Sequence, residues 1–185
     1  MHHVAVLVGS LRRESINRRF ASALAKLAQG KLDLRQIELG ELPMYNDDLW
    51  ENPPAAVVRL KQQVSAADAV LFVTPEYNRS IPPLLKNAID WGSRPRGESA
   101  WTGKPAGIVG TTGGAIGTAV AQSHLRHIVD VCDMRLMTQP EVYFVTKPGL
   151  IADDHTVTDE KSREFLAGYL AKFEAWITHH AKQGP

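Results

Sequence analysis

Short apolar runs alternate with amphipathic segments along almost the whole chain. Residues 3–8 (HVAVLV) and 69–73 (AVLFV) are apolar almost throughout, which is typical of strands buried on both faces of a sheet. The pattern predicts strands at residues 3–8, 32–37, 69–73, 106–110 and 134–137, the last continuing at 142–145 after a break at Pro140. It predicts helices at residues 15–29, 55–66, 81–91, 115–131 and 158–180, the last capped by Thr158.

Strands that alternate with helices indicate βαβ units and a parallel sheet. Five strands match the count of the flavodoxin-like arrangement, with strand order 2-1-3-4-5. We therefore expect a three-layer, doubly wound α/β fold and a single domain over residues 1–185. The longest irregular stretches are residues 43–54 and 93–104, and the second has the Gly and Pro punctuation of a flexible surface loop.

Composition narrows the classes of function. The 185 residues carry a net charge of +1 with no basic stripe, which argues against nucleic acid as a partner. No apolar run approaches the roughly 20 residues of a membrane helix, and the apolar run at the N-terminus is too short for a signal peptide. The single cysteine, Cys132, cannot form an internal disulfide, so we expect a cytoplasmic protein with a buried structural thiol.

The loops that follow the first and third strands are the candidate ligand site. In an open parallel sheet, ligands bind at the carboxyl ends of the strands where the strand order reverses, here between strands 1 and 3. The first loop, residues 9–17 (GSLRRESIN), leads into a helix N-terminus that favours an anion. It matches neither GxxxxGK[ST] nor GxGxxG, and its hydroxyls and amides suit a single terminal phosphate. The alternative is that Ser15 only caps the helix.

The second loop, residues 74–81, is stiff and polar. Pro75 restricts the backbone, Tyr77 offers a flat face, and Asn78 offers both a donor and an acceptor. These groups suit a planar heterocycle. A plain turn between strand and helix would use the same residue types.

Three segments together resemble the NADPH-dependent FMN reductase family, and its chromate- and quinone-reducing branch in particular. They are GSLRRESIN at 9–17, TPEYNRSIPPLLKNAIDW at 74–91 and GKPAGIVGTTGGAIGTAVAQSHLRHIV at 103–129. The resemblance runs from Val4 to about Pro140, and the second segment is its most specific part.

The resemblance implies a flavodoxin-like fold that binds FMN, with thirteen residues carried over by position. Those expected to hold the phosphate are Ser10, Arg12, Ser15, Ile16 and Asn17. Those expected to line the isoalloxazine ring are Pro75, Glu76, Tyr77 and Asn78. Those expected to close over its other edge, in the loop after the fourth strand, are Thr111, Thr112, Gly113 and Gly114. The family often has Ser in that last loop, where this chain has Thr and Gly.

The implied reaction passes a hydride from NADPH or NADH to bound FMN and then reduces quinones, chromate, azo or nitro compounds by a ping-pong mechanism. Such chemistry needs no protein acid, base or nucleophile, and the chain offers no paired carboxylates, Ser-His-Asp set or HExxH. Backbone N–H groups of residues 112–114 would stabilise negative charge on the reduced ring. The pair His124 and His127 does not make a convincing metal site, so we expect none.

Two further expectations concern charge and assembly. The arginines Arg79, Arg94 and Arg96 either meet the 2′-phosphate of NADPH or an anionic acceptor, or are solvated surface residues. Residues 122–129 resemble a helix that the family uses in subunit contacts, and with Trp91 and Trp101 nearby in sequence they predict a homodimer or homotetramer.

Two other classes of function stay open at this point. A flavodoxin-like electron carrier, or an FMN-binding module without NAD(P)H turnover, would share the fold, although carriers are expected to be strongly acidic. A nicotinamide-binding enzyme without flavin would use GTTGGAIG as its glycine loop, but that loop follows the fourth strand rather than the first.

Overall fold

A parallel sheet lies at the centre of the computed structural model, which describes residues 1–181. The strand order is β2-β1-β3-β4-β5, and β6 also pairs with β4. All pairings between these strands are parallel. The strands are β1 (His2–Val8), β2 (Leu32–Gln36), β3 (Ala69–Val73), β4 (Pro105–Thr112), β5 (Arg135–Leu136) and β6 (Tyr143–Val145). The predicted order 2-1-3-4-5 and the flavodoxin-like α/β class are confirmed.

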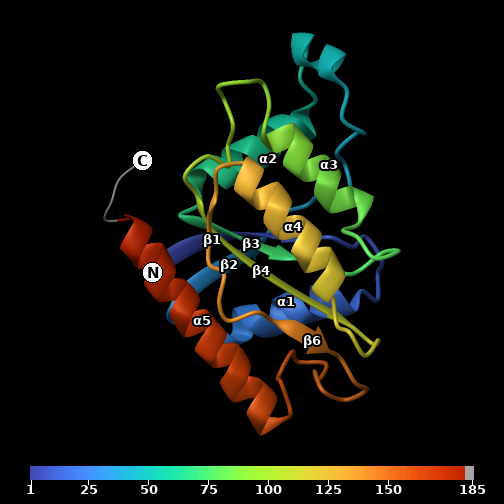
Figure 1. The fold of residues 1–185 in the computed structure, drawn as a ribbon, viewed down its shortest axis with the longest axis vertical. Coiled ribbons are helices and arrows are strands. Elements are labelled where there is room, and N and C mark those ends of the chain that lie inside the picture. Colours follow the sequence, from blue (N-terminus) through green and yellow to red (C-terminus); the bar gives the residue numbers. More distant parts are fainter. Residues whose placement is uncertain (182–185) are drawn as a thin grey trace.

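Helices cover both faces of the sheet (Figure 1). They are α1 (Ile16–Leu27), α2 (Ala55–Ala66), α3 (Pro83–Gly92), α4 (Ala119–Val131) and α5 (Glu160–Ala181), with a short 3₁₀ helix, η1 (Asp47–Glu51). Apolar residues of α1 and α5 share one core cluster with Val4 and Val6 of β1. Those of α2, α3 and α4 share the other cluster with Ala5 and Leu7, because successive strand side chains point to opposite faces.

The fifth position in the sheet is filled by two short strands. Arg135–Leu136 pairs with the start of β4, and Tyr143–Val145 pairs with Gly110–Thr112 at its end. The predicted continuation after Pro140 is therefore confirmed. Pairing with β6 also lengthens β4 to Thr112, two residues beyond the predicted strand.

Four helix starts differ from the prediction: α1 begins one residue later, α3 and α5 two residues later and α4 four residues later. Helix α4 begins at Ala119 rather than at residue 115, because Gly117 takes a left-handed φ of 60° and leaves residues 113–118 as a loop. The α5 cap is Asp159, whose Oδ2 accepts from the Ser162 amide at 2.8 Å. Thr158 is not the cap, since its hydroxyl donates to the carbonyl of Gly149 at 2.9 Å. Within residues 1–181, every helix is too short or too polar to span a lipid bilayer.

Candidate functional site

Three loops gather at the carboxyl edge of the sheet, after β1, β3 and β4. They lie along the right-hand side of Figure 1. The first loop begins against the end of β3, where the Gly9 amide donates to the Val73 carbonyl at 2.9 Å. A Cβ on Gly9 would lie only 2.7 Å from Pro82, so glycine allows the first loop to pack on the double proline of the second. The expected meeting of these two loops is confirmed.

The first loop presents hydroxyls and free amides at the start of α1. Ser10 and Ser15 are buried, at 7% and 4% exposure, whereas Arg12 is exposed. Ser15 is the N-cap, and its Oγ accepts from the Arg18 amide at 3.3 Å. This distance is long for a hydrogen bond, so the hydroxyl retains capacity for a ligand. Ile16, the first residue of α1, is 38% exposed beside it.

Asn17 points inward instead of toward a ligand. Its Nδ2 donates to the Thr111 carbonyl at 2.9 Å, and its Oδ1 accepts from the Thr111 amide at 3.1 Å. Asn17 is 2% exposed and Thr111 is fully buried. The side chain therefore joins the first loop to the end of β4, and only its backbone amide remains available to a phosphate.

The second loop forms a tight turn that presents Tyr77 and Asn78 to solvent. The backbones of Tyr77 and Ser80 exchange two hydrogen bonds of 2.9 Å. The two residues between them, Asn78 and Arg79, have left-handed φ angles of 49° and 63°. Pro75 is buried and Tyr77 is 48% exposed, whereas the Glu76 side chain is directed toward α4. The loop therefore exposes a flat aromatic ring and an amide on a fixed backbone.

The third loop, residues 113–118, begins with two exposed glycines, Gly113 and Gly114. Thr111 and Thr112 belong to β4, and the Thr111 hydroxyl is bonded to that of Thr146 at 2.5 Å. The expectation that Thr111 and Thr112 lie in the loop is wrong, because pairing with β6 extends β4 as far as Thr112. Gly113 and Gly114 are exposed, and no atom lies within 4 Å of a Cβ built on Gly113. The Gly114 amide donates to the Thr112 hydroxyl at 3.3 Å.

Close packing fixes the edge where β3 and β4 end. A Cβ on Gly110 would lie 2.2 Å from the Thr74 carbonyl oxygen and 2.3 Å from Thr118 Oγ1. The Thr74 amide donates to the Val109 carbonyl at 2.9 Å. Glycine is therefore required at position 110 for the second loop and the start of α4 to approach β4 this closely.

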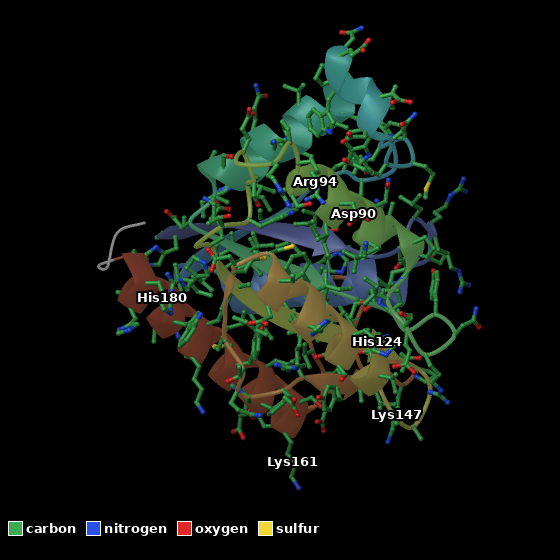
Figure 2. The ribbon with its side chains drawn as sticks, turned by 45° about the horizontal axis from the view of Figure 1, so that its top comes forward. Asp90, Arg94, His124, Lys147, Lys161 and His180 are labelled. Atoms are coloured by element: carbon green, nitrogen blue, oxygen red, sulfur yellow. The ribbon has the colours of Figure 1, made fainter. Side chains whose placement is uncertain are left out.

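A cavity of about 380 Å³ opens between α1, the third loop and the segment that follows β6. It is lined by Ile16 and Gly113, two predicted cofactor residues, and by the segment 146–149. Figure 2 shows Lys147 of this segment at the same end of the molecule as His124 of α4. Sequence reasoning missed residues 146–149 because they match no known motif. Only the pairing of β6 with β4 brings them to this edge of the sheet.

Other predicted residues lie elsewhere. Helix α3 runs back from the carboxyl edge, so Arg94, which follows its last turn, is not brought to the three loops; Figure 2 shows it apart from His124 and Lys147. Trp91 and Trp101 are fully buried, so their side chains are not available for subunit contacts.

Asn87 and Trp91, from the segment most specific to the family, bind the irregular segment 43–54, which we call the outer arm. Asn87 Nδ2 and Trp91 Nε1 each donate to the Pro43 carbonyl at 2.8 Å, and Asn87 Oδ1 accepts from the Tyr45 amide at 2.8 Å. They fix the arm that carries η1, so part of the LKNAIDW segment serves the fold and not the ligand edge.

Two ionisable groups have shifted pKa values that bear on the chemistry. Burial raises the pKa of the half-buried Cys132 thiol, and Asp90 raises it further, so the thiol is not a reactive nucleophile. Burial alone would raise the pKa of Glu76, but the Ala121 amide and the Arg79 guanidinium outweigh it and lower that pKa. Glu76 is therefore an anion at neutral pH.

Comparison with known proteins identifies the family of this chain. The family model described as NADPH-dependent FMN reductase matches residues 2–149. The chain belongs to that family. A 2-hydroxy-1,4-benzoquinone reductase from Burkholderia sp is 47% identical over 174 residues, which cover 94% of this chain and 95% of that one. An NAD(P)H-dependent FMN reductase from Pseudomonas aeruginosa is 38% identical and covers 91% of both chains.

A solved structure agrees with the family. The flavoenzyme NAD(P)H:(acceptor) oxidoreductase FerB from Paracoccus denitrificans superposes with a TM-score of 0.95 at 46% identity, covering 97% of this chain and 99% of that one. The predicted family is thus confirmed, as is the prediction of an FMN-dependent oxidoreductase that uses NAD(P)H.

The residues present fit such a cofactor. A phosphate needs amide donors and hydroxyls, and the start of α1 supplies both beside Ser10 and Ser15. A flat ring needs open space at the third loop, and a side chain at Gly113 would project into that space. The structure therefore offers a phosphate end and a ring end at one edge of the sheet.

Proposed function

We propose that this chain is an NAD(P)H:quinone oxidoreductase that works through FMN held by the three loops. The observation that carries the proposal is their convergence, with the α1 N-terminus at one end and the exposed turn and glycines at the other. The relative from Burkholderia sp is named for a benzoquinone substrate, and FerB for an NAD(P)H donor and an unspecified acceptor. When bound, FMN would supply the chemistry, accepting a hydride from the nicotinamide and passing two electrons to the acceptor.

The side chains divide into two groups in this assignment. At the phosphate end, the hydroxyls of Ser10 and Ser15, the Arg12 guanidinium and the amides of Ile16 and Asn17 would bind the anion. Their roles are to neutralise charge and to orient the cofactor. The Asn17 side chain is engaged with Thr111, so we assign it to the fold of the loop.

At the ring end, the backbone of Pro75–Asn78 and the amide of Gly113 would bind the ring edges. An aimed amide that stabilises developing negative charge is worth on the order of 2–4 kcal/mol. Thr112 contributes by holding the Gly114 amide, and Thr111 by fixing the end of β4. No protein acid or base is required, and Glu76 is an anion already engaged by three donors.

The open side of the ring end would accept donor and acceptor in turn. We therefore expect ping-pong kinetics. Since such a site makes few demands on the acceptor, chromate, azo and nitro compounds are proposed as further substrates beside quinones. The exposed side chains His124 and His127 on α4, together with Ile116 at 48% exposure, support assembly into a homodimer or homotetramer. The single thiol supports a cytoplasmic location.

The first test is an absorption spectrum of the purified protein supplied with FMN, before and after NADPH is added under argon. Flavin bands near about 370 and 450 nm that bleach with NADPH, and return when a benzoquinone is added, are the expected result. Bound FMN that stays oxidised would point instead to an electron carrier. Absence of FMN binding would overturn the proposal. Turnover with NADH and with NADPH, and light scattering during gel filtration, would measure donor preference and assembly.

A further inference from the structure

Helix α4 has no cap of its own at its N-terminus. Its N-cap residue, Thr118, makes no capping hydrogen bond, and the Thr118 hydroxyl accepts from Gln122 Nε2 at 2.8 Å. The first amides of a helix have no partner inside the helix and need one from elsewhere. Those of Val120 and Ala121 donate to Glu76 Oε2, at 3.0 and 3.1 Å. The cap is therefore a carboxylate 44 residues earlier in the chain.

The same carboxylate also holds the turn of the second loop. Glu76 Oε1 accepts from Arg79 Nη1 at 2.7 Å, and the Glu76 side chain is only 7% exposed. Arg79 and Asn78 are both left-handed, an arrangement that turns of this type usually give to Asn-Gly. A residue with a Cβ resists that conformation, so the turn needs support from its surroundings. The pair Glu76–Arg79 provides it.

A second contact ties the far end of the turn to α4. Ser80 Oγ lies 3.0 Å from His124 Nδ1, one helical turn beyond Val120. Figure 2 shows His124 on the outer part of the α4 ribbon. The turn is therefore attached to α4 on both sides. The exposed side chains of Tyr77 and Asn78 lie between the attachments and take no part in them.

We propose that Glu76 is a positioning residue for the cofactor, and that its buried carboxylate joins the second loop and α4 into one rigid wall on the ring side of the site. This inference rests on the proposed function, because it assumes that Tyr77 and Asn78 face the flavin ring. Glu76 does not act as an acid or base. Its two oxygens are occupied by two helix amides and a guanidinium, and its effect reaches the ring through the backbone that it fixes.

The experiment uses the full chain, first as apoprotein and then with FMN. The variants are Glu76→Ala, Glu76→Gln, which keeps the shape and one acceptor oxygen, and Glu76→Asp, which keeps the charge but is one methylene shorter. The matched control is Glu160→Gln, because Glu160 and Arg163 form another Glu–Arg pair three residues apart, exposed on α5. Unfolding curves establish that each variant is folded.

In the apoprotein, amide exchange measured by NMR reports the cap directly. We expect the amides of Val120 and Ala121 to exchange about two- to thirtyfold faster in Glu76→Ala, the range that corresponds to loss of a helix N-cap. Glu76→Gln should recover part of the protection, Glu76→Asp little of it, and Glu160→Gln should match the wild type. Unchanged exchange in Glu76→Ala would overturn the inference.

With FMN, we expect the dissociation constant of Glu76→Ala to rise about tenfold, with a spectrum shifted toward that of free FMN. The order of the variants should follow the order seen in amide exchange, and KM for NADPH should change less than FMN affinity. A wild-type protein that does not bind FMN would overturn the proposed function. A wild type that binds FMN, with Glu76→Ala binding it equally well, would overturn only the role of Glu76.

Discussion

Replacing Asn17 by alanine separates a structural role from a ligand role at the phosphate loop. The substitution removes both hydrogen bonds to Thr111, at 2.9 and 3.1 Å, and leaves the carbonyl and the amide of a fully buried residue without these partners. A hydrogen bond contributes about 1 kcal/mol net, and an unsatisfied buried group costs about 1–3 kcal/mol. For the two groups together we expect a loss of about 3 kcal/mol in the free energy of unfolding.

Thermal unfolding of the apoprotein measures this loss without any cofactor. In a chain of this size, 1 kcal/mol lowers Tm by about 2–4 °C, so Asn17→Ala should lower Tm by about 6–12 °C. Asn17→Asp should be no more stable than Asn17→Ala. The aspartate keeps the acceptor for the Thr111 amide, but it loses the donor for the Thr111 carbonyl and adds a buried charge. The control Asn52→Ala, at an exposed position, should stay within about 0.5 kcal/mol of the wild type.

The outcome that would refute this reasoning is equally specific. If the Asn17 amide bound the phosphate itself, the apoprotein of Asn17→Ala would keep its Tm and only FMN affinity would fall. We expect the opposite order: apoprotein stability falls first, and weaker FMN binding follows from a displaced loop. Measurement of both quantities on the same preparation distinguishes the two assignments.

Two further predictions concern packing and charge. In a denaturant titration, Gly110→Ala should lower the free energy of unfolding by at least about 3 kcal/mol, because its Cβ would meet a backbone carbonyl oxygen at 2.2 Å. The control Gly168→Ala lies on an exposed face of α5 with no atom within 4 Å of its Cβ, and it should raise the free energy of unfolding by about 0.5–1 kcal/mol. Lys26 Nζ donates to Asp154 Oδ2 at 2.8 Å and lowers the pKa of Asp154. The stability that this pair contributes to the fold is therefore complete above the unfolded pKa of about 4, and it is lost as pH falls through the lower folded pKa. The stability difference between wild type and Asp154→Asn should therefore shrink below about pH 4, and a difference that grows there would contradict this sign.

Most of the fold could be predicted because hydrophobic periodicity and turn residues agree along the chain. The predicted bounds of α2 and β3 match the structure, where Pro54 precedes one and an unbroken apolar run defines the other. The start of α4 was missed because GAIGTA continues a helical pattern, and only the tertiary structure places Gly117 against the Tyr143 backbone in a left-handed conformation. Propensity cannot reveal a contact with a strand that comes later in the chain.

The site was predicted at the level of loops but not of side chains. The rule that ligands bind at the carboxyl ends of parallel strands pointed to the loops after the first and third strands, and the family resemblance added the loop after the fourth. Asn17, Glu76 and Thr111 are polar residues in ligand loops, and each looks like a cofactor contact. Their side chains instead bond partners 94, 44 and 35 positions away in the sequence. Bonds of this range have no periodic signature, so one sequence alone cannot separate them from ligand contacts.

The long-range bonds explain how three loops can form a site before any cofactor arrives. Gly9 packs on Pro82 and joins the first loop to the second. Asn17 joins the first loop to the end of β4, and Glu76 joins the second loop to α4, which follows the third. The loops are thus held together by groups that, in the proposed assignment, do not contact the cofactor. Because ordering a loop on binding costs free energy, a site held in this way retains more of its contact energy as affinity for FMN. We therefore expect substitution of Asn17 or Glu76, whose side chains are bonded within the protein, to weaken FMN binding although neither side chain is assigned to the cofactor.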